Sequence, residues 1–260
     1  MKRKWPNITT KFPAALALAA VVLLWLGVTE GEAVPEFMLP SPVEVWRALV
    51  SDFGLLMEHT AVTLQEAGLG LAIGIGVALV LATVMHRVRW LYRAFYPLLV
   101  MTQTIPTIAI APLLVLWMGF GMAPKVTWVA LTTFFPIAVS LLEGYASTDR
   151  AYCDLLRSMG AGRWQIFRHV EFPAALGYFF SGLRVSVSYA VVGAVISEWL
   201  GGFEGLGVYM TRVKKAYAFD KMFAVILVIV VISLLLMGLV TVVRRLVMPW
   251  EGCEKLERND

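Results

Sequence analysis

Charged residues are scarce in this sequence. Only 15% of its 260 residues are Asp, Glu, Lys or Arg, whereas a soluble domain typically carries about 25%. Hydrophobic residues make up 59%, the mean hydropathy is +0.76, and long stretches contain almost no charge. This composition excludes an ordinary soluble domain and indicates a chain with several membrane-spanning helices.

Residues that could form disulfides or bind metals are also few. Both cysteines, Cys153 and Cys253, fall in segments that we predict below to face the cytoplasm, so we expect reduced thiols. The three histidines are far apart in the chain and lack the spacing of metal ligands: His59, His86 and His169. These residues therefore predict neither a disulfide framework nor a metal centre.

Motifs for nucleotide binding and catalysis are missing as well. The chain has no Gly-Lys dipeptide, hence no P-loop, and no Gly-x-Ser-x-Gly nucleophile motif. An ion-coupled carrier would normally keep carboxylates at mid-membrane depth, whereas the acidic residues in the predicted spans lie near an interface. We therefore predict that the chain is not an enzyme, binds no cofactor and lacks an energy source of its own.

Apolar runs that can cross a membrane, which takes about 17–25 residues, occur six times. The predicted spans cover approximately residues 12–28, 61–85, 94–119, 126–146, 174–200 and 222–243. The first run could be a signal peptide, but the residues after it make a poor cleavage site, so a retained helix is favoured. The third contains Pro97, Pro106 and Pro112 and is expected to be broken.

Basic residues are distributed unevenly across these spans. Fifteen of the 22 Lys and Arg residues fall on one side, six fall on the other, and Arg184 lies within the fifth span. Because Lys and Arg resist translocation, this bias predicts that both termini are cytoplasmic, and it explains the net charge of +4 without nucleic acid. The outer cluster Arg212, Lys214, Lys215 and Lys221 either faces the exterior, where a partner could meet it, or shows that the fifth span is misplaced.

Three local patterns predict further detail. Ser41 is expected to cap a short amphipathic helix over residues 42–52. Small residues recur every four positions on the second span and would allow close approach of another helix: Gly70, Gly74, Ala78 and Ala82. Residues 120–125 are predicted to form an outer turn.

We divide the chain into an N-terminal helix with its outer segment (1–60), a transmembrane domain (61–250) and a cytoplasmic tail (251–260).

A long polar stretch, residues 147–173, separates the fourth and fifth spans. Residues 154–159 have helical composition, Gly160-Ala161-Gly162 interrupts the helix, and a second helix is expected over 163–170, stopped by Pro173.

On this second helix, three apolar residues at three-residue spacing form an edge surrounded by arginines: Trp164, Phe167 and Val170. The spacing leaves two interpretations equal. The segment is either a surface helix resting among lipid headgroups or a docking element for a partner protein.

This segment resembles the EAA loop of ABC importer permeases, whose pattern is Glu-Ala-Ala-x3-Gly followed by an Ile-x-Leu-Pro ending. Here the first part reads Asp154-Leu155-Leu156-Arg157-Ser158-Met159-Gly160, and the ending reads Val170-Glu171-Phe172-Pro173. The glycine, the following Ala161, the spacing and the proline match. The acid is kept as Asp, and the two alanines are replaced by leucines.

Other stretches resemble the nitrate, sulfonate and taurine branch of that family. They are Gln103-Thr-Ile-Pro106 continuing to Gly119, Ser181-Gly-Leu-Arg184, Ser197-Glu-Trp-Leu200 continuing to Gly207, and Leu39-Pro-Ser-Pro42. Residues 205–212 also resemble permeases for thiamine precursors of the hydroxymethylpyrimidine type.

The resemblance implies an all-α, polytopic type I (MetI-like) ABC permease fold with about six transmembrane helices in a bacterial inner membrane. It implies the permease subunit of an ATP-driven importer for a small organic or anionic solute, with an aromatic thiamine precursor preferred over sulfonate, taurine or nitrate. The implied partners are a second, usually identical permease copy, two ABC ATPase subunits that bind ATP and Mg, and an extracytoplasmic solute-binding protein. The alternatives are an ion-coupled secondary carrier and a non-transporting membrane scaffold.

The resemblance also implies two sets of functional residues. The ATPase-coupling loop would use Asp154, Leu155, Arg157, Gly160, Ala161, Arg163, Phe167 and Pro173. The translocation path would be lined from Gln103, Thr104, Pro106, Pro112, Arg184 and Glu198. For two of these a structural role is favoured over solute contact. Arg184 could pair with Glu143 or extend its side chain toward the inner membrane face, and Glu198 could hold the outer Gly-rich segment.

Overall fold

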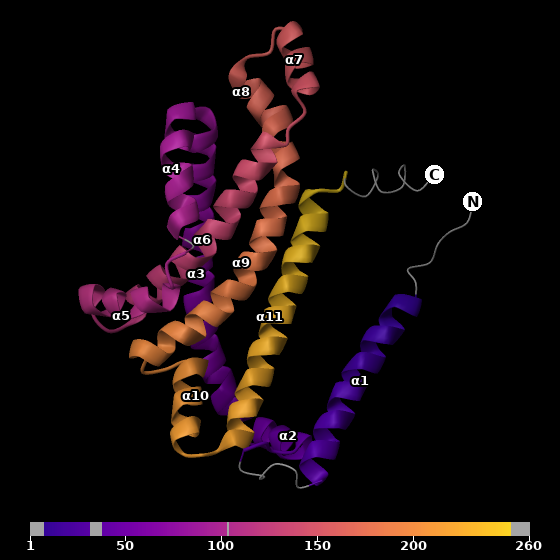
Figure 1. Cartoon of the computed structure of the whole chain (residues 1–260), viewed down its shortest axis with the longest axis vertical. Coiled ribbons are helices and arrows are strands. Elements are labelled where there is room, and N and C mark those ends of the chain that lie inside the picture. The colour runs from indigo at the N-terminus through magenta and orange to yellow at the C-terminus, as the bar shows by residue number, and fades with distance from the viewer. Residues whose placement is uncertain (1–7, 32–37, 103, 251–260) are drawn as a thin grey trace. The chain divides into compact units, whose positions relative to one another are not determined.

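The computed structural model describes residues 8–31, 38–102 and 104–250 (Figure 1). These residues form helices and contain no strand, which confirms the all-α prediction. The elements are α1 (Ile8–Glu30), α2 (Pro42–Ser51), α3 (Phe53–Arg87), α4 (Arg89–Thr102), α5 (Thr107–Met118), α6 (Met122–Ala146), α7 (Arg150–Ser158), α8 (Arg163–Ile166), a π-helical turn η1 (Phe167–Glu171), α9 (Phe172–Gly201), α10 (Leu206–Lys215) and α11 (Phe219–Val247).

Four helical stretches of the described chain are long and apolar enough to cross a membrane. They are Phe53–Arg87, Met122–Ala146, Arg163–Gly201 and Phe219–Val247, and they contain the second, fourth, fifth and sixth predicted spans. The first predicted span lies within α1. The chain is therefore a multi-pass membrane protein, and its fifth predicted span coincides with a helix of membrane-spanning length.

The third predicted span is broken. Helix α4 ends at Thr102 and α5 begins at Thr107, directly after Pro106. Proline lacks the N–H that a helix needs and disfavours helical backbone at the residue before it, so the break is local to Pro106. Pro97 and Pro112 lie inside helices, so they do not interrupt them.

The outer turn predicted over residues 120–125 is shorter than expected. Helix α6 begins at Met122 and includes Pro124 and Lys125 in its first turn, a position where proline costs no hydrogen bond. The chain reverses at Gly119 and Gly121, whose φ angles are +77° and +134°. The prediction was wrong about Lys125, which is buried and only 6% exposed.

Contacts divide the described chain into two compact units. One contains the residues up to 58 together with 209–228, and the other contains 59–208 and the residues from 229 onward. The predicted division at residues 60 and 250 follows position in the membrane rather than contacts, and it stays a prediction.

In the first unit, α2 packs through Val45 and Ala48 against Ala224 of α11. The predicted cap of α2 is confirmed, because the Ser41 hydroxyl accepts from the Glu44 N–H (3.3 Å) and the Glu44 carboxylate accepts from the Ser41 N–H (2.8 Å). Asp52, the residue after α2, accepts from the Tyr209 hydroxyl (2.6 Å) and pairs with Lys221 (2.7 Å). One member of the predicted basic cluster is therefore held in an ion pair.

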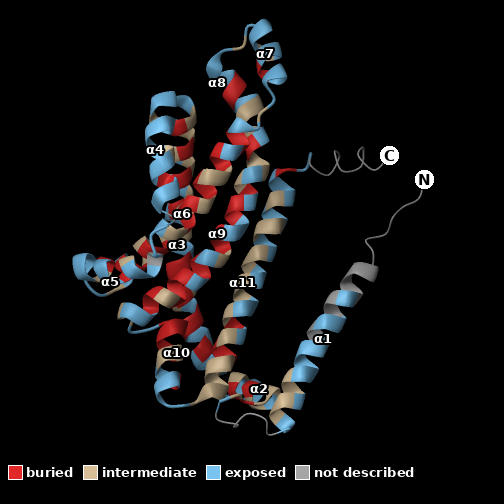
Figure 2. Ribbon diagram, in the orientation of Figure 1, coloured by how far each residue is buried: buried red, intermediate tan, exposed pale blue. Residues whose placement is uncertain are grey.

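The second unit is built around α6 and α9, which carry most of its buried residues (Figure 2). Their apolar contact includes Ile137, Leu141 and Val187, and the Ser186 hydroxyl of α9 donates to the Thr133 carbonyl of α6 (2.7 Å). Such close packing holds membrane helices together. Because lipid tails are as apolar as the helix surfaces, the hydrophobic effect does not favour helix association there.

The small-residue stripe on α3 packs against α6 as predicted. A side chain at Gly70 would collide with Val129, and one at Gly74 would collide with the Thr133 hydroxyl. Further along the stripe, Ala78 and Ala82 are completely buried. The stripe is therefore an interhelical contact, in which each glycine allows an approach that a larger residue would prevent.

Candidate functional site

A helical hairpin, α7 and α8, projects beyond the ends of α6 and α9 (Figure 1). Asp149 caps α7 by accepting from the Ala151 N–H (2.9 Å), so this helix begins four residues before the predicted one. Gly160 makes the turn with a φ of +83°, in the left-handed region that glycine favours. The N–H groups of Gly160 and Ala161 donate to the last carbonyls of α7, those of Arg157 and Leu156 (both 2.9 Å).

The second arm of the hairpin does not end at Pro173. Helix α8 continues through η1 into α9, so the chain is helical from Arg163 to Gly201. The predicted stop at Pro173 was wrong because this proline occupies the first turn of α9. A wide π turn precedes it, in which the Phe172 N–H donates to the Phe167 carbonyl five residues earlier.

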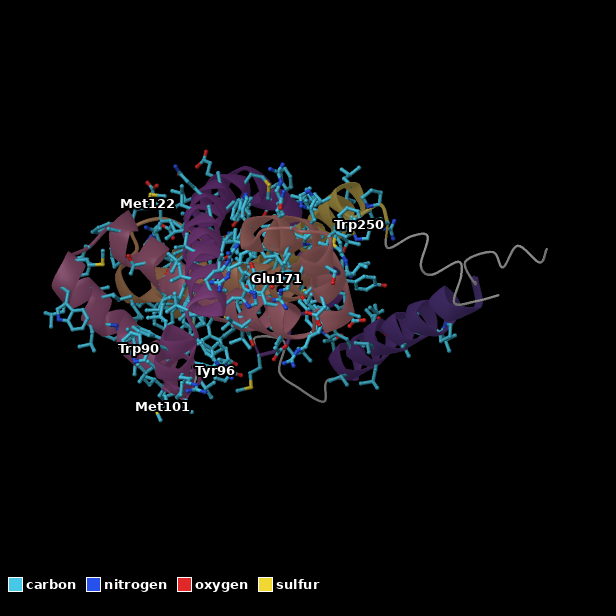
Figure 3. The ribbon with its side chains drawn as sticks, turned by 90° about the horizontal axis from the view of Figure 1, so that it is seen from above. Trp90, Tyr96, Met101, Met122, Glu171 and Trp250 are labelled. Atoms are coloured by element: carbon cyan, nitrogen blue, oxygen red, sulfur yellow. The ribbon has the colours of Figure 1, made fainter. Side chains whose placement is uncertain are left out.

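A cluster of aromatic and charged side chains fixes η1 to the neighbouring helices. His86 of α3 contacts Glu171 (3.0 Å) and stacks on Tyr145 of α6, with ring centres 4.6 Å apart. Arg87 lies over the ring of Phe167 at 4.4 Å, a favourable cation–π arrangement. In Figure 3, Glu171 lies among the side chains of the central helices, whereas Met101 of α4 lies at the periphery.

The exposed apolar surface of the hairpin differs from the predicted edge. Phe167 was expected on that edge, but it is only 6% exposed, because the cluster just described covers it. Four other large apolar residues are each more than half exposed: Tyr152, Leu155, Met159 and Trp164. The hairpin therefore offers apolar surface mainly on α7 and at the turn, with Arg157 and Arg163 beside it.

Cys153 lies on the inner face of α7. It is a free, buried thiol, and burial raises its pKa, so it stays neutral and unreactive at physiological pH. Cys253 lies outside the described residues, and the reduced state of both thiols stays a prediction.

A buried hydrogen-bonded cluster lies around Glu198, near the end of α9. Its carboxylate accepts from the Thr63 hydroxyl (2.7 Å) and from the Gly207 N–H (2.5 Å), and the Gly205 N–H donates to His59 (3.0 Å). Glu198 is 1% exposed and binds the Gly-rich segment through the Gly207 N–H, while its predicted place in the translocation path stays a prediction.

The other acid of this region, Glu66, is also buried. It pairs with Lys125 at 2.5 Å, and their side chains are 3% and 7% exposed. Glu66 is therefore covered by protein and paired, and its predicted position near a membrane interface stays a prediction. The sequence gives no direct signal for the pair because 59 positions separate its members.

The residues predicted to line the translocation path are not brought together. Gln103 lies outside the described residues. Thr104 is exposed, with its hydroxyl bonded to the Met101 carbonyl (2.7 Å), and both Pro106 and Pro112 are exposed. Arg184 is exposed and forms no ion pair with Glu143 in the described chain. Their role in transport stays a prediction.

A cavity of about 590 Å³ lies instead beside the break in the third span. It is lined by Thr102, Ile105, Ile110, Trp128, Leu131, Thr132, Phe134, Phe135, Pro136, Tyr189, Val192, Gly193 and Ile196. Most of these residues lie on α6 and α9. No residue of α6 was predicted to line the path, and the two predicted on α9, Arg184 and Glu198, do not line this cavity. The available signal was the spacing of Trp128, Thr132 and Phe135, which places them on one face of a helix.

Apolar helices around a close-packed core, a broken third span and a projecting hairpin define a multi-pass transport permease. Residues 70–248 match the family described as binding-protein-dependent transport system inner membrane component. The chain belongs to this family, which comprises the membrane subunits of ABC transporters.

Three relatives cover most of the chain. A probable ABC transporter permease protein of Haemophilus influenzae is 39% identical over 221 residues, covering 85% of this chain and 90% of that protein. A formylaminopyrimidine transport permease protein of Halalkalibacterium halodurans is 38% identical, covering 82% and 86%. A riboflavin transport system permease protein of Chloroflexus aurantiacus is 35% identical, covering 96% and 92%.

A solved structure confirms the predicted type I permease fold. A chain of the MetNI methionine ABC transporter in an inward-facing conformation matches with a TM-score of 0.60 and 21% identity. The match covers 74% of this chain and 94% of that one.

Proposed function

We propose that this chain is the translocating subunit of an ATP-driven importer, with both termini in the cytoplasm of a bacterial inner membrane. The observation that carries the proposal is the projecting α7–α8 hairpin, whose apolar side chains Tyr152, Leu155 and Trp164 are exposed. The sequence contains no nucleotide-binding motif of its own, so a hairpin that binds an ATPase would supply the missing energy.

In the proposed complex, two copies of the chain each present a hairpin to one ATPase subunit, and the ATPases bind ATP and Mg. Apolar residues of α7 would lie in a groove of the ATPase, a mode in which a helix buries one face. Arg157 and Arg163 would fix the orientation, because guanidinium groups make directional bonds to carboxylates.

Movement of the hairpin would reach the membrane through α9. Because α8, η1 and α9 are continuous, a displacement of Arg163 acts on a helix that extends to Gly201. The His86–Glu171 contact would pass the same movement to α3, and Phe167 would serve as an internal joint and not as a docking residue.

The proposed solute is a small organic molecule delivered by an extracytoplasmic binding protein. Two of the relatives described above carry heteroaromatic compounds in their names, a formylaminopyrimidine and riboflavin. We therefore prefer a heteroaromatic solute to a sulfonate, taurine or nitrate.

The proposal is tested by co-purification of the chain with an ABC ATPase encoded beside it, and by ATP hydrolysis that a loaded binding protein stimulates. The variant Gly160→Pro should abolish the complex, because proline cannot adopt a φ of +83° and lacks the N–H that bonds to Arg157. Gly162→Ala is the matched control, since Gly162 has a φ of −72° and a Cβ there meets only Gln165, at 3.7 Å.

An intact complex in Gly160→Pro would contradict the role of the hairpin. Uptake by the purified chain alone under an ion gradient would establish a secondary carrier instead. Absence of transport with every partner would leave a membrane scaffold.

A further inference from the structure

The cavity beside α6 and α9 has the size and composition of a small-molecule site. Its volume of about 590 Å³ falls within the roughly 300–1,000 Å³ of such sites. Phe134, Phe135 and Tyr189 give it an aromatic wall, and none of the described residues that line it is charged. An ionic solute would lose its hydration there without gaining a counter-charge, which is costly in a membrane interior.

One buried donor in the cavity wall points to a ligand. Trp128 is 3% exposed, and its indole Nε1–H has no hydrogen-bond partner within the described chain. Leaving a buried N–H without an acceptor is unfavourable, so buried indoles usually have a partner. An acceptor atom on a bound molecule would satisfy this group.

Gly193 of α9 keeps this donor accessible. A Cβ at Gly193 would lie 3.4 Å from Trp128 Nε1 and 3.4 Å from Thr132 Oγ1. The absence of a side chain at Gly193 therefore leaves an open position that both polar atoms face.

Thr132 provides an acceptor at the same position. Its hydroxyl hydrogen is directed to the backbone of its own helix, where the carbonyls of Trp128 (3.1 Å) and Val129 (3.0 Å) accept it. The oxygen lone pairs remain for a ligand. One donor and one acceptor thus lie side by side next to an aromatic wall.

We infer that this cavity is a solute site of the permease itself, and that it binds an uncharged planar heteroaromatic ring. A ring nitrogen or carbonyl of the solute accepts from Trp128 Nε1–H, and an amino or ring N–H donates to Thr132 Oγ1. The ring lies against the aromatic wall, where offset stacking adds to the area buried. The inference rests on the proposed function, since it assigns the transported solute to a place in the membrane subunit.

The test uses the full permease with its ATPase in lipid nanodiscs and two probes. Cytosine is an uncharged aminopyrimidine that carries both an acceptor and a donor, and taurine is a zwitterion of similar size, with one sulfonate and one ammonium group. Equilibrium dialysis with labelled probes should show saturable binding of cytosine and none of taurine.

Two variants locate the binding. Trp128→Phe keeps an aromatic ring but removes the indole N–H. Gly193→Ala covers this N–H with a methyl group at ordinary contact distance. Each should weaken cytosine binding roughly tenfold or more, as expected for losing a buried hydrogen bond. Gly76→Ala is the matched control on α3, where a Cβ meets nothing within 4 Å, and it should bind as the wild type does.

Thermal unfolding of each variant shows whether it is folded. Equal binding of cytosine by all variants would overturn the site, and binding of taurine would overturn the class of solute. A second permease copy filling the cavity would exclude both probes, which also overturns the inference.

The inference and the proposed function fail in different ways. Stimulated ATP hydrolysis without cytosine binding would contradict the proposed solute site but still support the importer function. Cytosine binding by a chain that recruits no ATPase would support the solute site and contradict the importer.

Discussion

Two turns of this molecule are made by glycines with positive φ angles, but the side chains packed around the two glycines differ. Gly160 and Gly205 have φ angles of +83° and +116°, which other residues rarely adopt. A Cβ at Gly160 would meet nothing within 4 Å, whereas one at Gly205 would overlap the Glu198 carboxylate. The first glycine is needed for the turn alone, and the second is needed also for a close contact.

The ion pairs near the two turns differ in the same way, since one is buried and the other is exposed. Glu66 and Lys125 form an ion pair with side chains 3% and 7% exposed. On α7, Asp154 and Arg157 form a pair with side chains 67% and 63% exposed. The buried charges near Gly205 are therefore paired within the chain, while the Gly160 hairpin retains surface that a partner would cover.

The largest expected effect is on the buried ion pair. Lys125→Met leaves the Glu66 charge without its partner, and we expect a loss of about 3–5 kcal/mol in the free energy of unfolding. Denaturant titration of the purified protein in detergent measures it. The double variant Lys125→Met/Glu66→Leu should recover most of the loss, and a double variant as unstable as the single one would show that the pair is not the cause.

A matched pair of substitutions compares the turns directly. Gly160→Ala should cost about 1 kcal/mol, the price of a non-glycine residue in the left-handed region. Gly205→Ala should cost about 3 kcal/mol, because Glu198 must also shift from the bonds it makes. Thermal unfolding of both variants under one condition gives the difference, and equal losses would remove the distinction drawn between the turns.

Asp52 provides an intermediate case, with a side chain 17% exposed. The ion-paired Lys221 and then the Tyr209 hydroxyl hold the pKa of Asp52 below its ordinary value. A carboxyl with a lowered pKa stabilises the fold above its unfolded pKa of about 3.9, and this contribution disappears as the pH falls through the lower, folded value.

Asp52→Asn should therefore reduce stability at neutral pH and flatten the loss of stability on acidification below about pH 4. Unfolding midpoints measured across this pH range test it. An unchanged acid slope in Asp52→Asn would mean that other carboxyls govern the response.

The smallest expected effect is on the exposed pair of the hairpin. Arg157→Gln should change the free energy of unfolding by no more than about 0.5 kcal/mol, as is usual for exposed pairs. If the hairpin binds an ATPase, the same variant should still weaken co-purification. A large loss of stability would place Arg157 in the internal structure of the chain.

Hydropathy predicted the membrane helices well because a span must be long and apolar throughout. Local chemistry also predicted the Ser41 cap, the turn at Gly160 and a break in the proline-rich third span, each of which depends on neighbouring residues. The partners of buried charges were not predictable in this way. His86 and Glu171 are 85 positions apart, and only the packing of α3 against the loop brings them together.

Burial of individual loop residues was equally out of reach. The three-residue spacing of Trp164 and Phe167 correctly identified an apolar face, but not which member the protein covers with its own side chains. The cavity was missed for a related reason. Trp128 and Thr132 both lie on α6, and their polar atoms face an open position only because Gly193 of α9 has no side chain.

The π turn at Phe167–Glu171 has a consequence for the direction in which the hairpin points. A π turn accommodates one residue more than an α turn, so each residue before it is rotated by about 100° relative to an uninterrupted α-helix. The one additional residue in the π turn therefore sets the side of the α9 axis on which Trp164 and the turn at Gly160 lie. Deleting one position from 167–171 would restore a regular helix and swing the hairpin to another side of the molecule without altering any residue on its surface.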